Sequence, residues 1–230
     1  MTPPISGYKH LSYPDGNVTQ FFGVNQALYS KVVCYPDNSL PEKKYCLHGH
    51  NGIDIVAPWG TLLLAVKDAV VSEVKDDAGG YGKHIRIIRD CGDGRAEEWT
   101  YGHCSEILVK LGQQVKAGNV IAKMGNTGFV VSGATPFWKY NPYAGTHLHL
   151  GVRYYKIWDG TGQYNLQMGG LKLTSVLNYY NGFYGAVDFG QELALATGAV
   201  DTPAISTLRL TLSSLYNQLE KLIKNSRKVG

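Results

Sequence analysis

Hydrophobic and polar positions alternate in short runs along most of the first 160 residues, and clusters of Gly, Asn and Asp interrupt these runs. Successive side chains of a β-strand point to opposite faces of a sheet, so this alternation predicts strands with one buried face. The clearest runs are rich in β-branched residues, which favour strands. They cover residues 61–66, 69–74, 83–89, 97–103, 120–123 and 147–154.

Turn residues indicate how these strands connect. Cys91-Gly-Asp-Gly94 separates two of the runs, so residues 83–103 are predicted to form a hairpin. Residues 129–146 contain many aromatic side chains and no clear period, which predicts a loop. The predicted fold is mainly β, with an antiparallel β-sheet core that carries an open groove, plus a C-terminal α-helix.

The pattern changes after residue 160. Residues 163–190 are rich in Gly and Tyr and show no clear period, whereas Thr202 and Pro203 are suited to the N-cap and first position of a helix. Apolar residues then recur at steps of three and four, which predicts an amphipathic helix. They are Ile205, Leu208, Leu212, Leu215, Leu219 and Leu222. Such a helix packs on its own domain, or it mediates self-association or docking to a larger particle.

Four parts of the chain are therefore predicted. They are an extended lead-in over residues 1–17, a main domain over 18–160, a Gly/Tyr-rich extension over 161–201 and the amphipathic helix over 202–230.

Composition narrows the class of protein. The 28 glycines, 16 tyrosines and 17% charged residues are typical of short strands and turns, and they exclude a disordered chain. The net charge of +4 suits an anionic surface such as a bacterial wall, but no dense run of Lys and Arg indicates nucleic-acid binding. No apolar run reaches the roughly 20 residues that span a bilayer.

The N-terminus lacks the basic start and apolar core of a secretory signal. If the protein acts outside the cell, we expect it to be delivered by another route. The four cysteines, Cys34, Cys46, Cys91 and Cys104, form no CxxC pair that would indicate zinc. A Cys34–Cys46 bridge would close a polar loop, and a Cys91–Cys104 bridge would join adjacent predicted strands. The sequence leaves both pairings and the redox compartment open.

Histidine and aspartate residues at short spacings indicate a metal site. His50 and Asp54 lie four residues apart, and the Asn-Gly between them argues against a helix. His147 and His149 lie two apart, so on a strand they point to one face. A catalytic zinc takes three protein ligands from His and Asp or Glu and leaves a fourth position for water. His48 is either an alternative ligand or a solvated loop residue.

The chain resembles the lysostaphin/LytM-type zinc endopeptidases, which cut peptide bonds in bacterial peptidoglycan. The resemblance runs in order over about residues 18–153, and the motifs that carry it include His50-Asn-Gly-Ile-Asp-Ile55, Thr100-Tyr-Gly-His103 and Thr146-His-Leu-His-Leu150. It implies a lysostaphin/LytM-like fold. The chain departs from the family in a longer segment between residues 128 and 147, in an elaborated loop between residues 24 and 48, and in a C-terminal part without a familiar wall-binding module. These differences concern substrate specificity rather than the metal site.

The resemblance also implies roles for individual residues. His50, Asp54 and His149 match the family's zinc ligands, which implies one Zn²⁺ per chain. His147 and His103 match two catalytic histidines beside the metal. The sequence does not say which of them takes the proton of the attacking water and which assists the oxyanion.

Substrate-binding residues are implied less directly. Asn25 falls where family members often carry an asparagine that lines the site. Phe137, Trp138, Tyr140 and Tyr143 belong to the longer segment, where they wall the substrate groove or cap the core.

The expected function is zinc-dependent hydrolysis of peptide bonds in peptidoglycan, either in the stem peptide or in the cross-bridge. Gly–Gly bonds and D-alanyl–diamino acid bonds are both compatible with the residues. The expected setting is a phage lysin or a virion-associated wall-degrading enzyme, which acts extracellularly after phage delivery or release by lysis. The alternative is a non-catalytic peptidoglycan-binding or regulatory protein on the same fold.

Overall fold

Antiparallel strands dominate the structure, which confirms the mainly β fold expected from the sequence. The structure is a computed structural model that describes residues 1–32, 34–36, 44–132, 135–136 and 141–196. The helix predicted over residues 202–230 lies outside these ranges, as do Phe137, Trp138 and Tyr140.

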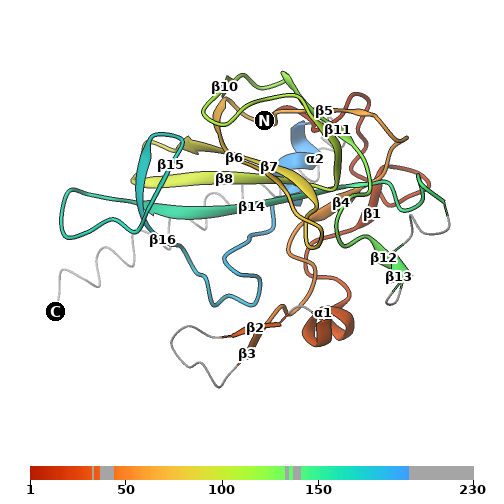
Figure 1. Cartoon of the computed structure of the whole chain (residues 1–230), viewed down its shortest axis with the longest axis horizontal. Coiled ribbons are helices and arrows are strands. Elements are labelled where there is room, and N and C mark those ends of the chain that lie inside the picture. The colour runs from red at the N-terminus through yellow and green to blue at the C-terminus, as the bar shows by residue number, and fades with distance from the viewer. Residues whose placement is uncertain (33, 37–43, 133–134, 137–140, 197–230) are drawn as a thin grey trace, which may run out of the picture. The chain divides into compact units, whose positions relative to one another are not determined.

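A nine-stranded sheet forms the centre of the molecule (Figure 1). Its main path has the order β1-β4-β14-β8-β7-β6-β10, and β16 pairs with both β14 and β15. The hairpin predicted over residues 83–103 is formed by β7 and β8. The strands are β1 (Val18–Gln20), β4 (Ile53–Ile55), β6 (Ala69–Asp76), β7 (Lys83–Asp90), β8 (Arg95–Gly102), β10 (Gln114–Val115), β14 (Leu148–Ile157), β15 (Leu166–Met168) and β16 (Leu171–Val176).

Smaller elements lie on the two sides of this sheet. Figure 1 shows β5 and β11 above it, and helix α1 with the β2–β3 hairpin below it. No helix in the described ranges is long and apolar enough to cross a membrane. These elements are α1 (Gln26–Val32), α2 (Gly190–Ala196), β2 (Cys34–Pro36), β3 (Lys44–Cys46), β5 (Leu62–Leu64), β9 (Cys104–Ile107), β11 (Val120–Met124), β12 (Val131–Ser132) and β13 (Thr135–Pro136).

One face of the central sheet carries the hydrophobic core. β4, β8 and β14 each direct alternate apolar side chains to this face, where they pack with Leu63 and Ile121 from β5 and β11. A fully buried Ile or Leu side chain contributes about 1.5–3 kcal/mol relative to an exposed one. The core residues of these three strands are Ile53, Ile55, Trp99, Tyr101, Leu148 and Leu150, all fully buried. The residues between them, including Asp54 and His149, must therefore point to the opposite face.

Both ends of the described chain pack on this core. Ile5 and Tyr8 are buried in it, and the backbone N–H of Thr2 donates to the Val66 carbonyl at 2.8 Å. Leu193 of α2 is also fully buried. The domain boundaries at residues 17, 160 and 201 stay predictions.

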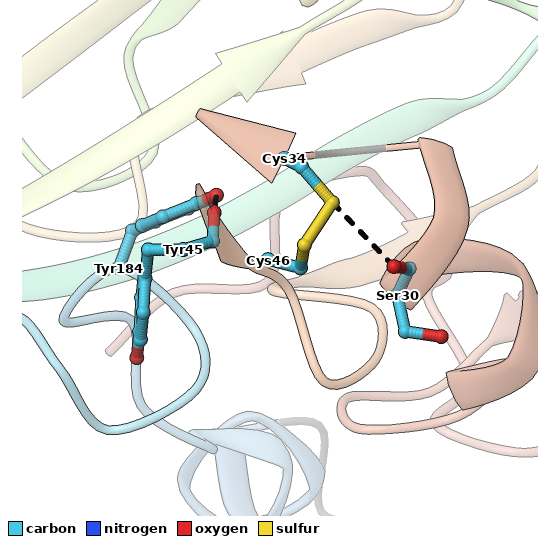
Figure 2. The surroundings of a disulfide bond; sticks show 5 residues. All are labelled: Ser30, Cys34, Tyr45, Cys46 and Tyr184. Carbon is cyan, nitrogen blue, oxygen red and sulfur yellow. Dashed lines mark hydrogen bonds between the residues drawn. A yellow bond between two sulfur atoms is a disulfide. The ribbon is translucent and has the colours of Figure 1, made fainter. Parts of the chain in front are cut away.

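A disulfide joins Cys34 and Cys46, which face each other across the β2–β3 hairpin. This is one of the two pairings that the sequence leaves open, whereas Cys91 and Cys104 are free thiols. Figure 2 shows the bridge close to Tyr45 and Tyr184. The Tyr184 hydroxyl donates to the Tyr45 carbonyl at 2.5 Å, so the hairpin is held to the segment that follows β16.

Candidate active site

Three ligand-type atoms converge on the face of the sheet opposite the core. Asp54 on β4 and His149 on β14 are direct cross-strand partners, and His50 approaches from the turn before β4. Asp54 Oδ1 lies 3.1 Å from His50 Nε2 and 3.2 Å from His149 Nδ1, and these two nitrogens are 2.9 Å apart. The strand pairing thus brings together residues that are about 95 positions apart in the sequence.

The geometry fits a divalent metal ion such as zinc. Ligand atoms placed tetrahedrally 2.0–2.1 Å from an ion are about 3.3 Å apart, close to the separations found here. His50 Nδ1 lies 3.3 Å from the Phe21 carbonyl oxygen. A proton donated to this carbonyl leaves the lone pair on Nε2, which faces the site. His149 Nε2 is buried with no hydrogen-bond partner among the described residues, so Nδ1 is the atom that His149 offers.

The electrostatic environment keeps Asp54 and His149 in the states that a metal requires. Burial alone would raise the pKa of Asp54, but the nearby His147 and His50, and hydrogen bonds from His149 and His50, hold this pKa well below its ordinary value. Burial lowers the pKa of His149, against the opposing effect of Asp54. An ionised carboxylate and a neutral imidazole are the metal-binding forms of these side chains.

Two further histidines stand beside this cluster. His147 Nε2 lies 3.7 Å from Asp54 Oδ2, and its Nδ1 is 2.7 Å from the Gly145 carbonyl oxygen. The ring of His103 lies 4.6 Å from that of His147, centroid to centroid, and its Nδ1 is 2.8 Å from the Thr127 carbonyl oxygen. In both residues a Nδ1 proton donated to a carbonyl leaves Nε2 able to accept a proton.

His103 is the more buried of this pair. Its exposed fraction is 6%, and the side chain of His147 is 17% exposed. Burial first, and then the neighbouring His147 and His149, lower the pKa of His103 to about 3. The backbone of His103 has a φ of 62°, where the chain turns out of β8 towards the site.

Gln20 links the cluster to β1 and was not identified from the sequence. Its Nε2 donates to Asp54 Oδ2 at 3.3 Å and to the Tyr29 hydroxyl at 3.1 Å. Asn25 does not contact the ligands, but its Nδ2 donates to Gln20 Oε1 at 2.6 Å. Asn25 thus orients the amide that in turn orients Asp54.

Glycines form the floor around His149. An ideal Cβ at Gly52 would lie 2.6 Å from His149 Cε1 and 2.6 Å from the Leu150 carbonyl oxygen. At Gly102 and Gly151 an added Cβ would come within 3.3 Å of the nearest side-chain or backbone atom. The His149 ring can take its position only because Gly52 lacks a side chain, while Gly102 and Gly151 leave tight but smaller clearances around it.

Gly52→Ala is therefore expected to reduce metal affinity by about 10–100-fold, because the new methyl group displaces the His149 ring. Gly79→Ala is the matched control, since no atom lies within 4 Å of a Cβ at Gly79. Metal titration of both variants, with a thermal melt to check folding, measures the effect. Equal affinity in Gly52→Ala and the control would contradict the role assigned to this glycine.

The ligand cluster opens into a groove made of connected hollows. One hollow, of about 440 Å³, runs towards Thr19 and Thr146, and another, of about 520 Å³, runs towards Lys75 and Tyr184. Both hollows are lined by Tyr29, His50, His103, Phe129 and His149, so the groove passes directly over the cluster.

The remaining predicted site residues lie elsewhere. His48 is exposed, and its backbone N–H donates to the Gly182 carbonyl at 2.8 Å, so it stands with the loop residues rather than with the ligands. Tyr143 is 60% exposed and packs against Trp59, outside the residues that line the groove.

Charged side chains continue the groove face beyond the metal cluster. His84 Nε2 lies 3.0 Å from Glu73 Oε1, and Lys75 Nζ lies 3.2 Å from Glu73 Oε2. The hydrogen bond from His84, assisted by Arg86 and Lys75 against the effect of burial, lowers the pKa of Glu73 from 4.5 to about 2.

Glu73 is expected to make stability depend on pH. Because its pKa is lower in the folded state, its ionised form stabilises the protein above about pH 4.5, and this contribution is lost as pH falls towards 2. Glu73→Gln should therefore lower the free energy of unfolding near neutral pH and match the parent protein near pH 2. Urea unfolding of both proteins across this range measures the difference, and a difference that does not change with pH would contradict the assignment.

Comparison with known proteins matches the part of the chain that carries the candidate site. The sequence profile of peptidase family M23 matches residues 48–163. The glycyl-glycine endopeptidase ALE-1 of Staphylococcus capitis is 35% identical over 80 residues, which are 35% of this chain and 21% of that protein. The murein hydrolase activator NlpD of Salmonella dublin is 34% identical over 151 residues, which are 66% of this chain and 29% of that protein.

One solved structure serves for comparison. The catalytic domain of EnpA, a prophage-encoded M23 protein from Enterococcus faecalis, is 26% identical with a TM-score of 0.40, over 64% of this chain and 85% of that one. The chain spans less than a third of the length of the curated relatives that it matches.

Proposed function

Because the chain belongs to peptidase family M23, we propose that it is a zinc-dependent endopeptidase that hydrolyses peptide bonds in bacterial peptidoglycan, in the stem peptide or the cross-bridge. The observation that carries this proposal is the convergence of His50, Asp54 and His149 within 3.2 Å of one another, with two histidines beside them on an open groove. The endopeptidase named among the relatives acts on glycyl-glycine bonds, which supports the same class of substrate.

The three ligands would hold the zinc, which supplies a Lewis acid and an activated water when bound. Two further hydrogen bonds hold these ligands in position. The Phe21 carbonyl fixes the tautomer of His50, and the amide of Gln20 holds the outer oxygen of Asp54.

His147 is the residue that we assign to proton transfer. It is the more exposed histidine, and its Nε2 faces Asp54 Oδ2. Its Nδ1 proton is engaged by Gly145, so Nε2 can take the proton of the attacking water and pass it to the leaving amine. The Nε2 of His103, whose ring adjoins that of His147, can accept a hydrogen bond that orients this water.

A regulatory role is the second candidate. The relative that covers 66% of this chain is named as an activator of murein hydrolases, not as a hydrolase. Such a protein would bind peptidoglycan or a hydrolase without cutting a bond. We prefer the enzyme because both the ligand set and the two neighbouring histidines are complete.

Zymography on purified cell walls, with and without a chelator, tests the proposal. We expect clearing that the chelator suppresses and that added zinc restores. Clearing that resists the chelator would exclude the zinc mechanism, while zinc-loaded protein that gives no clearing would favour the regulator. Mass spectrometry of muropeptides released from two wall types then identifies the bond that is cut.

Action outside the cell, after delivery by a phage particle or release by lysis, is part of the same proposal. It rests on the complete set of histidine and aspartate residues and on the amphipathic pattern predicted after residue 202. Mass spectrometry of purified virions from a lysogen that carries the gene is the direct test, and absence of the protein from particles and lysates would contradict it.

A further inference from the structure

A third hollow on the groove face contains two arginines. It has a volume of about 330 Å³. Arg86 and Arg153 are the charged side chains among its described lining residues, and the rest of the lining is polar, aromatic, aliphatic or glycine. Its walls include Thr100, Gly151, Tyr179 and Phe183. The proposed mechanism does not use this hollow.

The hollow continues the groove that passes over the metal cluster. It shares Asn51, Tyr81, Arg86 and Tyr184 with the 520 Å³ hollow that contains His149. In the sheet, Arg86 pairs with Thr100, and Thr100 pairs with Gly151, two residues along β14 from His149. Two residues of a strand span about 7 Å, so along the strand direction Arg86 lies one such step and Arg153 two such steps from His149. Arg86 is also displaced sideways by two strands, which are about 4.8 Å apart.

Glu98 lies beneath the two arginines and is fully buried. Arg153 Nε donates to Glu98 Oε1 at 2.8 Å, which pairs this carboxylate with one cation. Arg86 Nε lies 3.4 Å from Glu73 Oε1 and 3.8 Å from Glu98 Oε1, and it forms no hydrogen bond within the described ranges. Arg86 is therefore only partly paired.

The lining of this hollow is positively charged. Arg86 and Arg153 are its charged residues in the described part of the chain, and the buried Glu98, which pairs with Arg153, balances one of the two charges. No acceptor in the described part of the chain is hydrogen-bonded to the terminal nitrogens of Arg86 or Arg153. Their side chains remain 18% and 24% exposed, so these nitrogens are available to a ligand in the hollow.

We propose that Arg86 and Arg153 form a specificity-determining subsite that binds a free carboxylate of the peptide substrate. The inference rests on the proposed endopeptidase function and adds the chemical group of the substrate that the groove recognises. A guanidinium group presents parallel N–H donors that match the two oxygens of a carboxylate. An extended peptide advances about 3.3 Å per residue, so the carboxylate belongs about two to four residues from the bond that is cut.

Cell walls whose free carboxylates have been converted to amides provide the first test. Dye-labelled walls and the same walls after carbodiimide coupling with ammonia are compared as substrates. The protein is expected to hydrolyse the native walls at least tenfold faster than the amidated ones. Equal rates on the two substrates would overturn the subsite.

Variants separate the subsite from general attraction to an anionic wall. Arg86→Gln should reduce the ratio of the two rates to near one, whereas Lys110→Gln removes one positive charge from an exposed loop and should keep the ratio of the parent protein. Arg153→Gln is combined with Glu98→Gln, so that no unpaired carboxylate is left buried, and this double variant should also lose the preference. Circular dichroism and thermal melts establish that each variant folds. A folded Arg86→Gln protein that keeps the preference would overturn the proposal.

A binding experiment distinguishes failure of this inference from failure of the proposed function. His147→Ala protein, and the same protein with Arg86→Gln added, are sedimented with insoluble native and amidated walls. The first protein is expected to bind the native walls at least tenfold more tightly, and the second to lose that difference. If the parent protein cuts neither wall but this difference is found, the proposed function fails and the subsite stands. If the parent protein cuts both walls and the difference is absent, the subsite fails and the function stands.

Discussion

Replacing His149 with alanine is expected to abolish metal binding and peptidoglycan hydrolysis together. His149 Nδ1 lies within 3.2 Å of both other ligand atoms, and among the described residues the group that could hold a metal ion consists of His50, Asp54 and His149. Loss of a direct ligand should weaken zinc binding by more than the 10–100-fold that outer contacts contribute. Metal analysis of the purified variant and dye release from labelled walls measure the two effects.

His48→Ala is the matched control for this experiment. His48 is only two residues from a ligand in the sequence, but it is exposed and bound to the loop at Gly182. The His48→Ala protein should keep its full zinc content and full activity. A His149→Ala protein that retains a full equivalent of zinc would overturn the ligand assignment.

His147→Ala is expected to separate the two properties, because it should keep zinc and lose turnover. His147 Nε2 lies 3.7 Å from Asp54 Oδ2 and is not one of the three converging atoms. Proton transfer by a positioned side chain contributes about 10²–10⁴-fold to a rate, so kcat should fall by this factor. Metal analysis measures the zinc content, and the steady-state rate of muropeptide release measures kcat.

Either of two results would contradict that assignment. If zinc is lost with His147, this residue is a ligand rather than a proton carrier. If kcat is unchanged, proton transfer belongs to another group, and His103→Ala becomes the decisive variant because its ring adjoins that of His147.

The sequence was sufficient to predict the longer strands of the sheet and the hairpin, because period-two alternation survives wherever one face of a strand is buried in the core. Ile85 and Ile87 on β7, and Leu148 and Leu150 on β14, show this pattern clearly, whereas the three-residue strand β4 was not predicted. Alternation also assigns Asp54 and His149 to the other face, although it cannot say that β4 and β14 are neighbours. The family resemblance implied that Asp54 and His149 bind one metal ion, and the structure supplies the pairing of β4 with β14 and its register.

Other parts of the site had no signal in the sequence. Gln20 reaches Asp54 only because β1 pairs with β4 through an irregular register between Val18 and Gln20. Arg86 and Arg153 read as ordinary solvent-facing positions on strands, since a buried carboxylate such as Glu98 cannot be recognised without knowing what covers it. Residues 179–186 form part of the layer around the hollow above Glu98, and their sequence shows no clear hydrophobic period.

The glycine floor beneath His149, above all Gly52, also limits how the substrate selectivity of this protein could change, by engineering or by evolution. Any side chain placed at Gly52 would strike the His149 ring or the Leu150 carbonyl, so this position cannot be used to adjust which peptide is accepted. New selectivity has to be introduced through the walls of the groove, at residues such as Leu28, Thr146 and Tyr184. A mutational library confined to these walls would therefore explore substrate range while the metal centre stays intact.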